Sequence, residues 1–94
     1  MPVKVHVTSA LVRHLNASPE LEFQAASLGE LLDEADRQVD GFRDSICDEA
    51  GNVRVYVNIF VNGENIVGGH DPLSAPLRDG DEIYILANVA GGKR

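Results

Sequence analysis

The fold is decided by residues 53–63, which read VRVYVNIFVNG. Valine, isoleucine, tyrosine and phenylalanine fill most of this stretch, and such β-branched and aromatic side chains favour an extended strand. The strand is predicted over residues 53–61. The Asn62-Gly63 dipeptide that follows is typical of a tight hairpin turn, because both residue types tolerate positive φ angles. A short return strand is expected at residues 65–67.

Upstream of this hairpin, the sequence predicts one main helix. Ser27 lies three residues before Glu30, which is the spacing of a capping box in which each side chain satisfies a free backbone N–H. Apolar residues then recur at three- and four-residue spacing along one helical face: Leu28, Leu31, Leu32, Ala35 and Val39. Gly41 is a natural place for this helix to stop.

Three further strands complete the predicted sheet. Apolar and polar residues alternate over residues 3–7, and Leu21 and Phe23 share one face of residues 20–24, so these two segments are expected to pair as a hairpin. A turn at residues 79–81 leads into a last strand over residues 82–87. Residues 73–77 are expected to form one helical turn and residues 44–52 a loop. Strands arranged around a single helix indicate a one-domain α+β fold, a mixed sheet of four to five strands with the helix on one face.

The composition of the chain is acidic, with 15 acidic and 8 basic residues among 94 and a formal charge of -7. This balance disfavours nucleic acid and membranes as partners, because phosphate binding needs clustered Lys and Arg. Cys47 is the single cysteine, which fits a reducing, intracellular setting. The first residues lack the apolar run of a signal peptide and no stretch is long enough to span a membrane, so a cytoplasmic location is expected.

Little in the sequence predicts catalysis or metal binding. His6, His14 and His70 are scattered without the helical spacing of metal ligands, so solvated, structural roles are expected. Cys47 lies among acidic residues that raise the pKa of a thiol, which disfavours a catalytic nucleophile. We therefore expect no catalytic residue, no metal site and no cofactor.

One face of the sheet is expected to be apolar and open. The residues of the long strand expected to face the core are Val53, Val55, Val57, Ile59 and Val61. Tyr56 and Phe60 then point the other way, and the same alternation over residues 82–87 turns Tyr84 and Leu86 outward. If the two strands are neighbours, these four side chains form an exposed patch of the kind that marks protein interfaces. A covering loop or a second copy of the chain is the alternative.

A second glycine pair, Gly91-Gly92, lies near the end of the chain, where no further element needs a turn. Glycine has no Cβ, so two in succession suit a narrow channel and close approach to a reacting group. Residues 88–92, if extended, reach about 17 Å beyond the sheet. The pattern alone leaves two interpretations open: a frayed terminus, or a tail that enters another protein's active site.

The chain resembles the MoaD/ThiS family of ubiquitin-like sulfur carriers, and within it the CysO-like branch. The resemblance rests on residues 57–63, 77–83 and 85–92, together with the helix that opens at Leu28, and it covers nearly the whole chain. It implies a β-grasp fold, with the domain over residues 1–88 and a flexible C-terminal tail over residues 89–94.

The resemblance also implies a chemistry for the tail. In that family an ATP-dependent enzyme of the ubiquitin-activating type adenylates the terminal glycine, and sulfur then replaces the adenylate to give a thiocarboxylate. Carried over here, Gly92 bears the thiocarboxylate and Gly91 threads the channel. Members usually end at Gly-Gly, whereas this chain continues with Lys93-Arg94. Cleavage between Gly92 and Lys93 by a JAMM-type or similar protease is therefore expected.

Several partners and alternatives follow from the same resemblance. A sulfur-accepting enzyme of cysteine, molybdopterin or thiamine biosynthesis, or of tRNA thiolation, would receive the sulfur, and the expected partner-binding residues are Tyr56, Phe60, Tyr84, Leu86, Val89 and Ala90. The carrier itself would not be an enzyme, although it could be the small subunit of a molybdopterin synthase-like complex. The alternatives are a modifier joined to lysines through Gly92 and a binding subunit whose tail has no chemistry.

Overall fold

The computed structural model describes residues 2–68 and 71–87. Within them the elements are, in chain order, β1 (Val3–Val7), α1 (Ser9–Leu15), β2 (Glu20–Phe23), α2 (Leu28–Gln38), α3 (Phe42–Ile46), β3 (Val57–Val61), β4 (Glu64–Asn65), the 3₁₀ turn η1 (Pro72–Ser74) and β5 (Glu82–Ala87). The strands form a mixed sheet in the order β2-β1-β5-β3-β4. β1 and β5 are parallel, and the other neighbouring pairs are antiparallel. The predicted α+β fold with a mixed sheet is confirmed.

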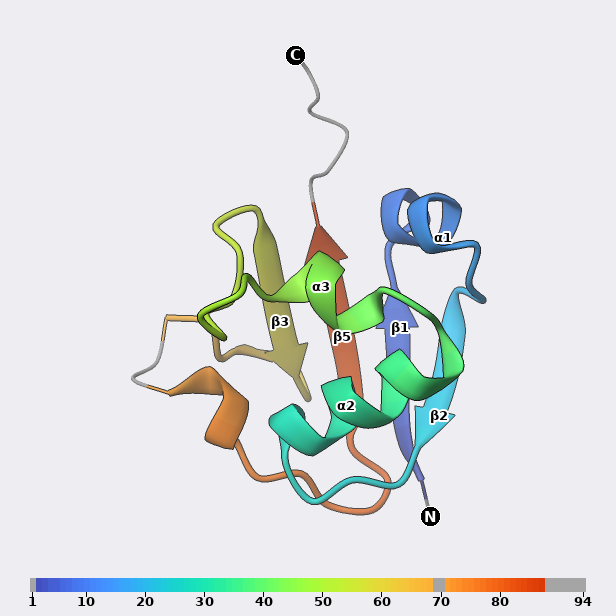
Figure 1. Cartoon of the computed structure of the whole chain (residues 1–94). Coiled ribbons are helices and arrows are strands. Elements are labelled where there is room, and N and C mark those ends of the chain that lie inside the picture. Colours follow the sequence, from blue (N-terminus) through green and yellow to red (C-terminus); the bar gives the residue numbers. More distant parts are fainter. Residues whose placement is uncertain (1, 69–70, 88–94) are drawn as a thin grey trace.

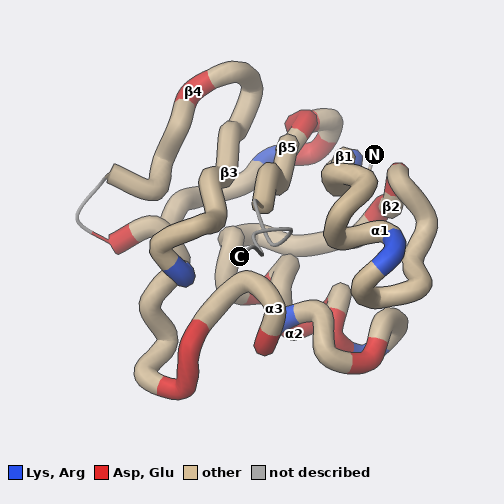
Figure 2. Tube along the Cα trace, turned by 90° about the horizontal axis from the view of Figure 1, so that it is seen from above, with Lys and Arg blue, Asp and Glu red and all other residues tan. Residues whose placement is uncertain are grey.

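A single core lies between the sheet and α2, which crosses one face of the sheet together with α3 (Figure 1). Alternate strand residues point into this core because successive side chains of a strand face opposite sides. The strands contribute Val3, Val5, Val7, Phe23, Val57, Ile59, Ile83, Ile85 and Ala87, and the helices contribute Leu11, Leu28, Leu31, Leu32, Ala35, Phe42 and Ile46. The opposite face of the sheet has no described helix over it (Figure 2).

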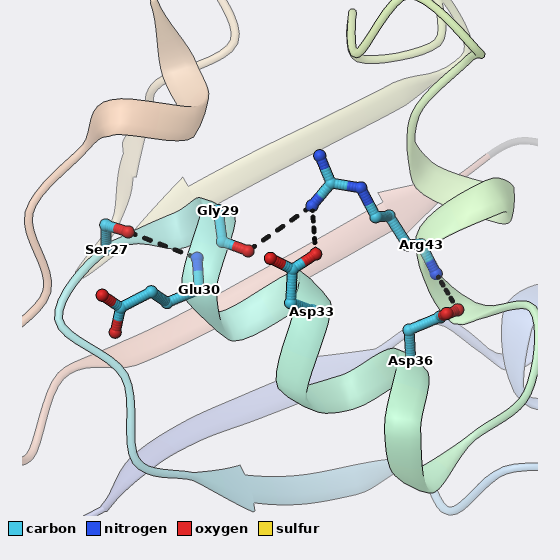
Figure 3. Close-up of polar contacts among 6 residues, drawn as sticks. All are labelled: Ser27, Gly29, Glu30, Asp33, Asp36 and Arg43. Carbon is cyan, nitrogen blue, oxygen red and sulfur yellow. Dashed lines mark hydrogen bonds and ion pairs between the residues drawn. The ribbon is translucent and has the colours of Figure 1, made fainter.

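The predicted cap of α2 is present. Ser27 Oγ accepts a hydrogen bond from the backbone N–H of Glu30 at 3.2 Å (Figure 3). The Glu30 carboxylate accepts from the N–H of Ala26 at 3.1 Å, one residue before the cap residue itself. The helix ends at Gln38, before Gly41, whose φ of 86° instead turns the chain into α3. Gly41 therefore begins the next helix and does not stop this one.

Two short helices lie where the sequence predicted none. α1 connects β1 to β2, which still pair antiparallel as predicted, and it inserts the fully buried Leu11 into the core. α3 occupies the start of the predicted loop at residues 44–52 and buries Phe42 and Ile46, which are four residues apart on one face. Each helix is seven residues or fewer, too short for periodicity to identify it, and tertiary burial stabilises it.

The long strand predicted over residues 53–61 begins only at Val57, so the prediction was wrong for residues 53–56. Val53 forms an isolated antiparallel bridge with Cys47, and the N–H of Val57 donates to the carbonyl of Arg54 in a turn. This turn leaves the Val55 side chain 101% exposed, not in the core. The alternating pattern was correct only where a neighbouring strand is available for pairing.

The two predicted turns around the sheet are both formed. Asn62 and Gly63 have φ angles of 52° and 89° and join β3 to β4, which spans residues 64–65 where residues 65–67 were expected. Gly80 has a φ of 86° in the turn before β5. Asn62 ties the two turns together, because its amide donates to Asp81 at 2.9 Å and accepts from the N–H of Glu82 at 3.0 Å.

Candidate docking surface

The open face of the sheet is built around β5, its central strand. The bounds of β5 are those predicted, and burial alternates along it as predicted. Ile83 and Ile85 are fully buried, whereas Tyr84 and Leu86 are 43% and 42% exposed on the opposite side. Exposed large apolar side chains at neighbouring positions of one face are a feature of protein-binding surfaces.

The neighbouring strand β3 brings further apolar side chains to this face. In the antiparallel register Phe60 lies opposite Tyr84, and Asn58 lies opposite Leu86. Phe60 is partly buried, and Tyr56 is 39% exposed just before β3, whose first residue pairs with the last residue of β5. We call Tyr56, Phe60, Tyr84 and Leu86 the apolar patch. The structure thus brings Phe60, Tyr84 and Leu86 onto two paired strands, with Tyr56 at the end of the sheet where β5 ends.

A charged cluster that the sequence did not predict borders the apolar patch. The His6 ring stacks on the Tyr84 ring with centroids 4.3 Å apart and an interplanar angle of 12°. Its Nε2 lies 3.1 Å from Glu82, and its Nδ1 lies 3.5 Å from Glu20. The His6 side chain is only 24% exposed, so it is less solvated than expected. Only the parallel register of β1 with β5 places His6 beside Tyr84, and no local sequence pattern reveals that register.

The remaining predicted site residues lie outside the described residues. They are Val89, Ala90, Gly91, Gly92 and Lys93. The described chain ends at Ala87, the last residue of β5, opposite Val57 in the β3 register. The described chain therefore ends beside the exposed Leu86 and Tyr56 of the apolar patch.

Cys47 has the environment of a structural residue. Its side chain is buried, and burial raises the pKa of the thiol, with Asp48 adding to the rise while Arg43 and Arg54 oppose it. A raised pKa leaves little thiolate, which is the reactive form. Across residues 2–68 and 71–87, no three His, Cys, Asp or Glu side chains gather as a metal site would require. The helices of these same ranges are all too short or too polar to span a bilayer.

Comparison with known proteins places this arrangement in a defined class, the ubiquitin-like β-grasp carriers. The sulfur carrier protein CysO of Mycobacterium tuberculosis (strain H37Rv) is 29% identical over 96 residues, covering 98% of this chain and 100% of that protein. Small archaeal modifier protein 3 of Haloferax volcanii is 32% identical over 68 residues, 71% of each chain. The structure of a BexX/CysO complex from Amycolatopsis orientalis matches with a TM-score of 0.82 and 28% identity, covering 96% of this chain and 99% of that one.

A family model described as the ThiS family matches residues 9–92 of this chain. The chain belongs to the ThiS family. This is a family of sulfur carriers related to ubiquitin-like modifiers, and its sulfur carriers are not catalysts. The fold and family predicted from the sequence are therefore confirmed.

Proposed function

We propose that this chain is the precursor of a cytoplasmic sulfur carrier that acts through Gly92. A JAMM-type or similar protease hydrolyses the Gly92–Lys93 peptide bond, which releases Lys93-Arg94 and leaves a free carboxylate on Gly92. That carboxylate attacks the α-phosphorus of ATP in an activating enzyme, and pyrophosphate leaves. A sulfur nucleophile at the sulfide level then attacks the acyl carbon and displaces AMP, which gives the thiocarboxylate.

One observation above all supports this proposal: the match to the ThiS family extends through residue 92, the second glycine of the Gly91-Gly92 pair. A carboxylate is a poor electrophile, and an acyl adenylate provides the leaving group that sulfur transfer needs. While Gly92 is held in a peptide bond, it has no carboxylate to activate. Processing before activation therefore follows from the chemistry, with residues 89–94 as the tail and Gly91 as the residue that threads the partner's channel.

The apolar patch is the proposed docking surface for the activating enzyme and for the enzyme that accepts the sulfur. Tyr84 and Leu86 are exposed on the strand that leads directly into the tail, so a partner covering them is positioned to receive Gly92. Aromatic side chains contribute strongly to protein interfaces because they bury much area with few rotatable bonds. Val89 and Ala90 would extend the same contact toward the partner's active site.

The proposal is tested first by the intact mass of the protein purified from its native cells. A species that ends at Gly92 with one oxygen replaced by sulfur is the expected result. Deleting Gly92 should abolish this species, whereas replacing Lys93-Arg94 by a stop codon should preserve it and remove the need for the protease. Full-length chain alone in active cells would overturn the proposal.

The docking surface is tested separately with tail chemistry kept intact. Leu86→Asp places a charge in the apolar patch, and Ala50→Asp adds the same charge in the exposed loop after α3. With a chain that ends at Gly92, we expect Leu86→Asp to lower kcat/KM for ATP–pyrophosphate exchange by the activating enzyme by at least about tenfold, the loss typical of a central interface residue. Ala50→Asp should match the wild type. Equal rates for all three proteins would show that the patch does not dock this enzyme.

A second function is conjugation of Gly92 to lysine side chains of other proteins. The observation that favours it is the similarity to small archaeal modifier protein 3. Both functions begin with the same acyl adenylate, and they differ in whether sulfur or a lysine amine attacks it. Immunoblots with an antibody against this chain separate them, because conjugation predicts a ladder of larger species that disappears when Gly92 is deleted.

A further inference from the structure

A free edge of the sheet lies at β2, away from the apolar patch. β2 is the outermost strand on one side, next to β1 (Figures 1 and 2). The N–H of Val7 donates to the carbonyl of Pro19 at 2.9 Å. This bond shows which residue pairs of the antiparallel β1–β2 ladder are hydrogen-bonded. Because hydrogen-bonded and non-hydrogen-bonded pairs alternate, Leu21 and Phe23 direct their backbone groups to β1. The backbone groups of Glu20 and Glu22 therefore point to the outer edge.

The hydrogen bonds on the other side of β1 agree with this assignment of backbone directions. The N–H of Lys4 donates to the carbonyl of Asp81 at 2.9 Å, and the N–H of Thr8 donates to the carbonyl of Ile85 at 3.2 Å. The even-numbered residues of β1 thus bond toward β5, which leaves its odd-numbered residues to bond β2. Within residues 2–68 and 71–87, β2 therefore presents a row of donors and acceptors that no other strand pairs with, which is the feature that extended peptides bind by adding a strand.

The side chains of this edge are acidic on the open face. Glu20 and Glu22 are exposed there, opposite His6 and Lys4 in the β1 register. Side chains directly opposite one another on paired strands lie about 5 Å apart and favour opposite charges. A strand added beyond β2 would accordingly favour Lys or Arg at the two positions that face these glutamates.

On the other side of β2, toward α2, the edge borders an open hollow of about 450 Å³, lined by Pro2, Glu22, Phe23, Gln24, Glu34 and Gln38. An added strand would alternate, so the residues between its basic positions would point to this side. Phe23 is buried beneath this hollow, and two glutamates and two glutamines make up most of its lining, so the hollow leaves room for a side chain of modest size without selecting an apolar one.

One other occupant of this edge and one other edge of the sheet fit less well. A second copy of the chain pairing through β2 would oppose glutamate to glutamate, which is destabilising. At the opposite edge of the sheet, β4 has only two residues, and the Asn65 side chain already bonds Asn58 and the N–H of Val67. The longer and acidic edge is at β2.

We propose that the free edge of β2 binds, as an antiparallel strand, an extended segment of a partner protein in which Lys or Arg alternates with strand-forming β-branched residues. The basic side chains face Glu20 and Glu22, the peptide backbone pairs with these two residues, and the side chain between the basic positions lies over the hollow beside Phe23. This site uses neither the tail nor a residue of the apolar patch, and His6 lies between its Glu20 and Tyr84 of that patch.

The test uses the full ¹⁵N-labelled chain and the peptide acetyl-Lys-Val-Lys-Val-Lys-Val-amide, followed by amide chemical shifts. Saturable shifts over residues 20–24 are expected. In the antiparallel strand the lysines opposite Glu20 and Glu22 direct their amides to β2. N-methylation of the three lysine amides removes these donors, and we expect the dissociation constant to rise about tenfold. The isomer with the three valine amides methylated has the same mass and charge, but its blocked donors face away from β2, so it should bind like the parent peptide.

The charge requirement is tested on the protein side. Glu22→Gln keeps the shape of the side chain and should weaken binding about two- to fivefold, the effect of one cross-strand charge pair. Glu49→Gln removes the same charge from an exposed loop and should leave binding unchanged. Equal binding of the two methylated isomers, equal effects of the two variants, or shifts centred on Tyr84 and Leu86 would each overturn the proposal.

Discussion

Asp36 on α2 supplies the cap that α3 lacks. The N-cap residue of α3 is Gly41, which has no side chain to bond the first helical amides. The Asp36 carboxylate replaces it by accepting from the N–H of Arg43 at 3.0 Å (Figure 3). The Arg43 guanidinium reaches back to Asp33 at 2.8 Å and to the Gly29 carbonyl at 3.5 Å, so the two helices are joined by backbone and side-chain contacts.

These contacts differ in expected strength, and Asp36→Ala should be the more costly change. Loss of a capping acceptor costs about 0.5–2 kcal/mol, and because this bond is partly buried we expect about 1–2 kcal/mol for Asp36→Ala. Asp33→Ala breaks an ion pair whose carboxylate side chain is 62% exposed, so screening by solvent should limit the loss to about 0.5 kcal/mol. Asp36→Asn keeps an acceptor oxygen and should recover most of the stability.

Urea denaturation followed by far-UV circular dichroism measures these differences. In a domain of this size, each kcal/mol lowers Tm by about 4–8 °C, so thermal melts give a second reading. Asp40→Ala is the matched control, because Asp40 is exposed between the two helices and its removal changes the charge equally. If Asp36→Ala costs no more than Asp33→Ala or Asp40→Ala, or if Asp36→Asn does not restore stability, the capping argument is refuted.

Three further predictions test the local chemistry. Cys47 is buried and the pKa of its thiol is raised, so in the native protein it should react with 5,5′-dithiobis(2-nitrobenzoic acid) only as slowly as the structure opens. The reaction should be fast in urea, and a fast reaction of the native protein would contradict this prediction. The Asn62 hydrogen bond, followed by the Arg78 N–H, lowers the pKa of Asp81 in the folded state, so its stabilisation is present above the ordinary carboxyl pKa and is lost as pH falls through the lowered value. Urea midpoints of the wild type should therefore fall more between about pH 5 and pH 2 than those of Asn62→Ala; parallel curves would exclude the linkage. Gly41→Ala, at a φ of 86°, should cost about 1–2 kcal/mol in urea denaturation, whereas Gly68→Ala, with open space around it and no positive φ, should be nearly neutral; equal costs would refute the backbone argument.

The parts of the fold that could be predicted are those that local patterns determine. β5 was predicted over its full length because a turn at residues 79–81 precedes an apolar, strand-forming run, and in the fold this run has a partner strand on each side. Ser27 and Glu30 predicted the start of α2 because a capping box acts within one helical turn. The outward direction of Tyr84 and Leu86 followed because successive side chains of a strand face opposite sides, so two residues of the apolar patch were predictable without knowledge of the topology.

The parts that could not be predicted depend on contacts distant in sequence. Val55 continues an alternating pattern, yet the pairing of Val53 with Cys47 turns the chain and exposes it. α3 depends on a cap from another helix, supplied by Asp36. His6 and Tyr84 are stacked only because β1 and β5 run parallel in one register. In each case the determining partner is supplied by tertiary structure, which overrides local propensity.

The positions of the two proposed surfaces restrict the kind of partner that could use both. β2 and β5 are separated by β1 alone, and neighbouring strands are about 4.8 Å apart, so a strand added beyond β2 would lie roughly 14 Å from β5. Four or five extended residues cover that distance. A partner that covers Tyr84 and Leu86 and carries a basic segment a few residues away could therefore bind both surfaces. Once one of the two surfaces is bound, contact with the other forms within the same complex. Such a partner would hold the carrier through the β2 edge while the tail enters and leaves its active site, so retention and release of the tail would be separate events.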